Sequence, residues 1–164
     1  MMISRRLALL ACLALAACGF HPLYGERGQA AENLSVVSLD NIEGKDGQKL
    51  RLLLSDRFYG SRAPATPEWR LEVGFTSVKQ QLGIRRDDTA TRARLTLKAD
   101  FILRRMGEEE PVFKGSERSF VSYNILTDPY ATLAAEENAT ERGLVQLSDM
   151  MASRIALYLA GQQQ

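Results

Sequence analysis

Two stretches of the chain alternate between apolar and polar residues, as expected of strands that bury one face of a sheet. The first places Trp69, Leu71, Val73 and Phe75 between polar or small residues. In the second, every odd-numbered residue from 93 to 103 is Ala, Leu or Phe, whereas the even-numbered residues between them are mostly polar or charged. Residues 112–123 predict a third strand, with a polar patch at 116–119, and the three runs together form a meander.

Another strand and two helices flank this meander. Residues 34–42 predict a first strand, and apolar residues at helical spacing predict a helix over about 47–59, with Asp46 as its N-cap and Gly60 just past its end. A longer helix is predicted from Pro129 to about residue 159, with Asp128 as its N-cap. Its predicted buried side consists of Leu133, Thr140, Leu144, Leu147, Met151, Ile155 and Tyr158.

The element order strand, helix, strand, strand, strand, helix predicts an α+β fold. Antiparallel strands with one apolar face are expected to bury that face under helices. The fold class is therefore a two-layer sandwich: a four-stranded, mostly antiparallel sheet with both helices on one face.

The N-terminus has the pattern of a secretory signal peptide. Arg5 and Arg6 precede an uncharged run that ends at Ala17 and is too short to span a membrane. The string Leu-Ala-Ala-Cys at 15–18 resembles the bacterial lipobox, which implies that Cys18 carries a diacylglycerol and an N-acyl chain; such multiple chains hold a protein stably at a membrane. The predicted organisation is a signal peptide (1–17), a lipidated Cys with a tether (18–33) and one domain (34–164). An ordinary secreted protein with an incidental thiol is the alternative.

Composition excludes several classes of function. Removal of 17 residues from the 164 would take Arg5 and Arg6 from the 21 basic residues and leave 19 against 20 acidic ones, a balance that argues against bulk nucleic-acid binding. Cys12 would leave with the signal peptide, and His21 is the one histidine, so neither a metal site nor a histidine-based triad is predicted. We expect no catalytic residue and no cofactor besides the lipid on Cys18. A hydrolase that uses only carboxylates (Asp87, Asp88, Asp100 or Glu117) is the enzymatic alternative.

Basic residues gather on the polar face of the second and third strands of the meander. The candidate ligand-binding set is Arg85 and Arg86 in the turn before the second strand, Arg92, Arg94 and Lys98 on that strand, and Lys114 and Arg118 on the third. Cations two residues apart on one sheet face form a fixed ladder that suits phosphate or carboxylate groups. The alternative is a solvated face, balanced by Asp100, Glu117 and the nearby glutamates.

The two ends of the predicted mature chain carry a resemblance to a known family. Cys-Gly-Phe-His-Pro-Leu-Tyr-Gly at 18–25, Ser-Tyr-Asn at 122–124 and Asp-Pro-Tyr-Ala at 128–131, together with the element order, resemble the LptE family of lipopolysaccharide-assembly lipoproteins. The resemblance implies an outer-membrane lipoprotein that plugs the LptD β-barrel, assists its assembly and helps deliver lipopolysaccharide to the cell surface. Gly19 after the Cys is compatible with outer-membrane delivery. An auxiliary lipoprotein of a lipid-transport ABC system is the alternative function.

Overall fold

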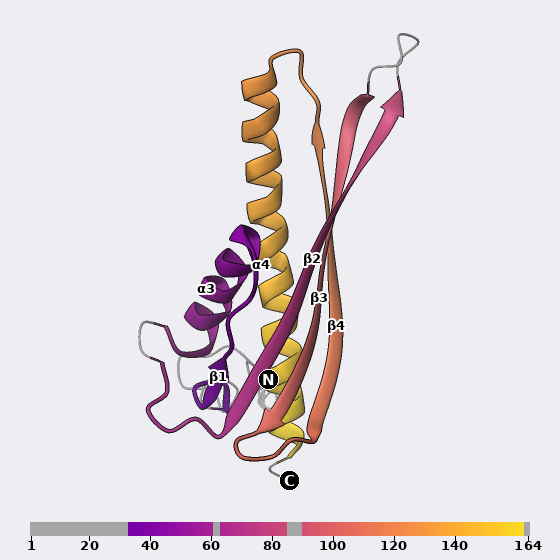
Figure 1. Ribbon diagram of the computed structural model, residues 1–164. Coiled ribbons are helices and arrows are strands. Elements are labelled where there is room, and N and C mark those ends of the chain that lie inside the picture. Colours follow the sequence, from indigo (N-terminus) through magenta and orange to yellow (C-terminus); the bar gives the residue numbers. More distant parts are fainter. Residues whose placement is uncertain (1–32, 61–62, 85–89, 163–164) are drawn as a thin grey trace, which may run out of the picture.

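The structure of the chain is a computed structural model that describes residues 33–60, 63–84 and 90–162. Its elements follow the order β1 (Val37–Leu39), α3 (Lys45–Tyr59), β2 (Trp69–Ile84), β3 (Ala90–Arg105), β4 (Pro111–Asn124) and α4 (Pro129–Gly161) (Figure 1). The predicted α+β class and element order are confirmed. The predicted signal peptide, Cys18 and nearly all of the tether lie outside the described residues.

The strands form one sheet in the order β1-β2-β3-β4. The three long strands are antiparallel, whereas β1 runs parallel to β2, with Val37 opposite Trp69. β1 is shorter than the predicted strand at 34–42 at both ends. Asn33 and Leu34 are helical and a turn follows them, and the chain leaves the sheet after Asp40, whose N–H donates to the carbonyl of Leu71 at 3.0 Å. The sheet is therefore mixed, with one short parallel strand at its edge.

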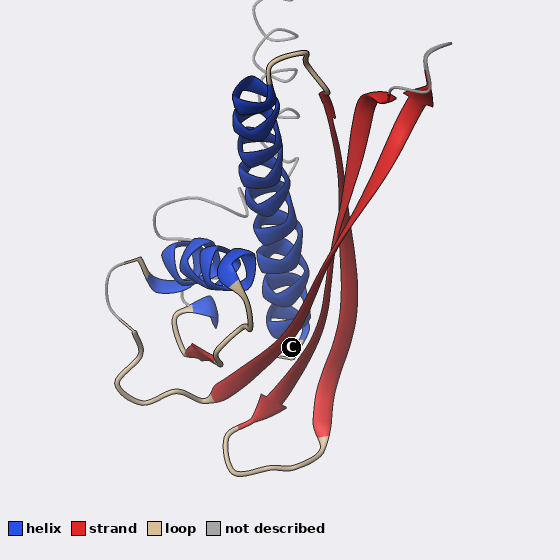
Figure 2. Ribbon diagram, turned by 45° about the horizontal axis from the view of Figure 1, so that its top comes forward, coloured by secondary structure: helices blue, strands red, loops and turns tan. Residues whose placement is uncertain are grey.

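Both helices cover the same face of the sheet, which we call the inner face (Figure 2). The predicted alternation places the odd-numbered residues of β3 on this face, and all six from Ala93 to Leu103 are buried. α4 runs along β3 and β4, and α3 packs beside α4 at the end of the sheet that carries β1 (Figure 1). On the opposite, outer face no helix of the described residues lies over the sheet (Figure 2).

Gly143 sets the closest approach of α4 to the sheet. A Cβ atom at this position would lie 2.6 Å from Cδ1 of Leu97 and 3.1 Å from Cγ2 of Val121. These distances are shorter than ordinary van der Waals contacts between carbon atoms, which are about 3.5–4 Å. The absence of a side chain at Gly143 therefore allows the helix to contact β3 and β4 directly.

The two helix starts differ in how well the sequence predicted them. Asp128 caps α4 as expected, since its Oδ1 accepts a hydrogen bond of 2.9 Å from the N–H of Tyr130. Asp46 is not the cap of α3: the helix begins at Lys45, after Gly44, which has a φ of 82° and no side chain to cap with. Asp46 lies instead in the first turn, where a carboxylate still interacts favourably with the helix dipole.

Leu133 is not on the buried side of α4. Its side chain is 56% exposed, although the predicted stripe of buried residues began with it. In this first part of the helix the positions that face the sheet are Ala135 and Ala139, which pack with Leu95 and Tyr123. In the first turns of α4, the side that faces the sheet is therefore the side of Ala135 and Ala139. Extension of the spacing of the later buried residues back to Leu133 did not predict this.

We expect Gly143→Val to destabilise the domain by about 1–3 kcal/mol, because the added methyl groups would overlap Leu97 and Val121. The free energy of unfolding in urea measures the effect. Valine is slightly more favourable than glycine inside a helix, so propensity alone predicts no loss, and comparison of Ala134→Gly with Ala134→Val at an exposed position of the same helix measures this contribution. A Gly143→Val variant as stable as wild type would show that α4 does not approach the sheet closely at Gly143.

Candidate ligand-binding face of the sheet

The outer face consists of the even-numbered residues of β2 and β3 and those of β4 from Lys114 to Asn124. The strand register arranges them in rows across the three strands. One row contains Thr76, Lys98 and Arg118, and the next contains Val78, Thr96 and Phe120. Successive rows lie about 7 Å apart, because same-face residues are two positions apart along a strand.

The structure brings five of the predicted ligand-binding residues together on this face. Arg92, Arg94 and Lys98 come from β3, and Lys114 and Arg118 come from β4. All five except Lys98, which is half-buried, are exposed. The other two predicted residues, Arg85 and Arg86, lie outside the described residues.

Few carboxylates balance these cations. Lys98 Nζ donates to Asp100 Oδ2 at 2.6 Å, and this hydrogen bond is the main reason that the pKa of Asp100 is lowered, followed by a hydrogen bond from Ser116. Arg104 Nε lies 3.1 Å from Glu72 Oε1. Within the described residues, no salt bridge involves Arg92, Arg94, Lys114 or Arg118.

The expectation that Glu117 balances this face is wrong. Glu117 is odd-numbered and pairs across the strands with the buried Ala99, so its side chain lies on the inner side of β4. There its Oε1 accepts a hydrogen bond of 2.6 Å from Nη1 of Arg154 on α4. The outer face consequently carries a larger excess of positive charge than it would if Glu117 lay on it.

An exposed apolar row crosses the basic face. Val78 is 52% exposed and Phe120 is 61% exposed, and they flank Thr96 on the strand between them. The neighbouring rows contain Arg94 on one side and Lys98 with Arg118 on the other. This row was not predicted from the sequence, although Phe120 lies two positions after Arg118 on the same strand and therefore on the same face. The combination suits a ligand that has both anionic and apolar parts.

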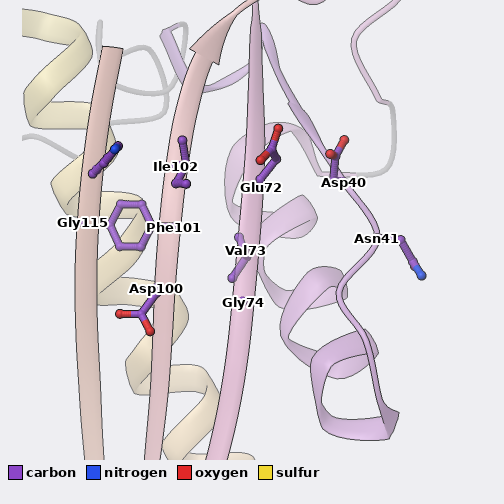
Figure 3. A pocket seen from close by; sticks show the side chains of 10 residues that line it. Asp40, Asn41, Glu72, Val73, Gly74, Asp100, Phe101, Ile102 and Gly115 are labelled. Carbon is purple, nitrogen blue, oxygen red and sulfur yellow. The ribbon is translucent and has the colours of Figure 1, made fainter. Parts of the chain in front are cut away.

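A depression adjoins the basic rows toward the β1 end of the outer face. Its volume is about 710 Å³, and it lies over Gly74, which has no side chain to fill the surface (Figure 3). The carboxylates of Asp40, Glu72 and Asp100 line it together with Lys114, and Figure 3 shows Asp100 directed toward β4. Within residues 33–60, 63–84 and 90–162, no group of three or more His, Cys, Asp or Glu side chains is arranged to hold a metal ion.

A polar cluster lies between α4 and the inner face of the sheet, near the N-terminal end of α4. Glu136 Oε2 of α4 lies 2.5 Å from Lys79 Nζ of β2 and accepts a hydrogen bond of 2.7 Å from the hydroxyl of Tyr123 on β4. The pKa of Glu136 is lowered, first by the hydrogen bond from Lys79 and then by that from Tyr123. This cluster attaches the N-terminal part of α4 to β2 and β4, the first and last strands of the meander.

Three solved structures share this architecture. A putative lipoprotein from Caulobacter crescentus CB15 is 27% identical, with a TM-score of 0.65, and the match covers 81% of this chain and 96% of that one. The rare lipoprotein B from Shewanella oneidensis is 15% identical, with a TM-score of 0.57, and the match covers 77% and 100% of the two chains. A minor lipoprotein from Acinetobacter baumannii is 15% identical, with a TM-score of 0.58, and the match covers 76% and 92%. No sequence among the curated proteins matches the chain.

The described residues place the chain in a class of small α+β domains, with helices over one face of the sheet and no described helix over the other. Within the described residues, no helix is both long and apolar enough to cross a membrane. The sequence pattern of the LptE family, described as lipopolysaccharide-assembly, matches residues 31–159, which is most of the chain. The chain belongs to the LptE family.

We expect Glu136→Gln to lower the stability at pH 7 by on the order of 0.5–1 kcal/mol, because it removes a partly exposed ion pair with Lys79. The folded pKa of Glu136 lies below its ordinary value of 4.5, so its contribution is present above pH 4.5 and is lost as the pH falls through the folded pKa. Melting temperatures of wild type and variant should therefore converge in acid. A difference that stays constant down to acidic pH, or equals that of Glu141→Gln on the same helix, would contradict this.

Proposed function

We propose that the chain is a non-enzymatic, lipid-anchored subunit of the outer-membrane lipopolysaccharide translocon, and that it contacts lipopolysaccharide through its outer sheet face. Membership of the lipopolysaccharide-assembly family supports the ligand class. The observation that carries the assignment of the face is the exposed apolar row that lies between Arg94 and Arg118, two exposed cations for which no salt bridge is present among the described residues.

Each part of this face matches a part of the proposed ligand. Lipopolysaccharide is an amphiphile whose lipid part carries phosphate groups. Exposed guanidinium groups such as those of Arg94 and Arg118 form charge-assisted, bidentate hydrogen bonds to phosphate. Val78 and Phe120 offer apolar surface for acyl chains, and burial contributes about 25 cal/mol per Å² of apolar surface removed from water.

The proposed partner is an LptD-like β-barrel in the outer membrane, which the domain would plug and whose assembly it would assist. Family membership supports this partner. An anchor at Cys18 would hold the domain at the same membrane, and the three similar structures come from lipoproteins. Apart from the lipid on Cys18, we propose no cofactor. Two or more acyl chains on that residue would make the attachment to the membrane stable.

We expect the double substitution Arg94→Ser with Arg118→Ser to weaken lipopolysaccharide binding about tenfold. Each exposed charge contact contributes on the order of 0.5–1 kcal/mol, and 1.4 kcal/mol corresponds to a factor of ten. The dissociation constant should also become less sensitive to salt, because fewer screened contacts remain.

Arg142→Ser is the matched control, because it removes an exposed arginine from α4 on the other side of the molecule. Phe120→Ser should weaken binding and leave the salt dependence unchanged. Equal affinities of the double variant and the control would refute the assignment of the outer face.

We expect Cys18→Ser to abolish labelling of the protein with radioactive palmitate and to leave an uncleaved precursor, because the lipid attaches to the thiol. A variant with Cys12→Ser should be labelled as wild type is. Normal labelling of Cys18→Ser would remove the lipid anchor from the proposal.

A further inference from the structure

The C-terminal end of α4 and the start of β2 lie at the same end of the domain, which we call its base (Figure 1). A second cavity is lined by residues of these two segments. Its volume is about 420 Å³, which is within the range of 300–1,000 Å³ that is common for ligand pockets. Asn33, the first described residue, and Gln162, the last, both line it. It shares no lining residue with the depression on the outer face.

The wall of this basal cavity is aromatic and held in place. Trp69, Val112 and Tyr158 line it, and each is half-buried. The hydroxyl of Tyr158 donates to the carbonyl of Val112 at 3.0 Å, and its ring stacks on Phe113 with 4.5 Å between centroids. The guanidinium of Arg105 lies 5.6 Å from the centre of the Trp69 ring.

The rim of the basal cavity is polar. Glu68, Arg105, Glu108 and Gln162 line it beside the aromatic residues. An aromatic wall under a polar rim suits a side chain that is apolar along its body and polar at its tip, as tyrosine is. Backbone groups of a bound segment would find hydrogen-bond partners at the same rim.

We propose that the basal cavity binds the chain's own residues 20–24, with the ring of Tyr24 against Trp69 and Tyr158. Phe20, Leu23 and Tyr24 are the large apolar residues between Cys18 and Asn33. Residues 25–32 (Gly-Glu-Arg-Gly-Gln-Ala-Ala-Glu) offer none. The apolar part of the segment is therefore confined to one short stretch.

Chain length makes this docking sterically possible. Eight residues separate Tyr24 from Asn33, which already lines the cavity, and an extended chain spans about 3.3–3.6 Å per residue. Closure of so short a loop costs little additional entropy. The attached segment also has a high effective concentration, in the millimolar range for short flexible linkers.

Docking of residues 20–24 would shorten the tether. If Cys18 carries the lipid, the base of the domain would then lie close to the membrane, and the far ends of β2 and β3 would point away from it. This consequence for the membrane rests on the proposed function, whereas the docking itself does not.

Trp69 is the one tryptophan of the chain and lines the cavity, so its fluorescence reports on the cavity directly. In the full-length lipidated protein in detergent, Tyr24→Ala should increase quenching by acrylamide and shift the emission to longer wavelength. Tyr130→Ala, at a residue that is 84% exposed near the start of α4, should change neither. Unchanged quenching in Tyr24→Ala would overturn the proposal.

A disulfide test does not depend on fluorescence. Tyr24→Cys combined with Gln162→Cys should form a 24–162 disulfide rapidly under mild oxidation, because docking brings the two positions together. Tyr24→Cys combined with Gln80→Cys, in the far half of β2, should not. Mass spectrometry of the linked peptides identifies the bond. Equal rates for the two pairs would contradict the docking, and palmitate labelling tests the anchor separately.

Discussion

The packing of α4 against the inner face of the sheet is the constraint on which the rest of the structure depends. Gly143 lets the helix contact Leu97 and Val121 directly, and the buried residues of β3 and α4 form most of the core. Strand alternation then forces the remaining residues of the meander outward. Because α3 and α4 lie on one face, neither covers the outer face, and its cations and apolar row are exposed in the part of the chain that the structure describes.

The elements that follow from local periodicity were predictable from the sequence. The alternation around Leu71 and Leu97 gave the long strands, and Asp128 before Pro129 gave the start of α4. What depends on distant contacts was not predictable. The parallel pairing of β1 with β2 requires Val37 to lie opposite Trp69, far along the chain.

In the candidate site too, local periodicity predicted some features and contacts between distant residues determine the others. Arg92, Arg94 and Lys98 could be assigned to one face because all three are even-numbered residues of the same strand. Placement of Glu117 on the helix side and of Phe120 on the outer face required the register between β3 and β4. The basal cavity could not be predicted at all, because its wall combines the ends of three elements that meet only in the folded domain.

The most direct test of the central claim is affinity purification of the full-length protein from detergent-solubilised membranes, with mass spectrometry of the proteins that accompany it. Membership of the LptE family and the open basic face lead us to expect a large outer-membrane β-barrel protein and bound lipopolysaccharide. Recovery of an inner-membrane ATPase complex instead, without a barrel protein, would contradict the account.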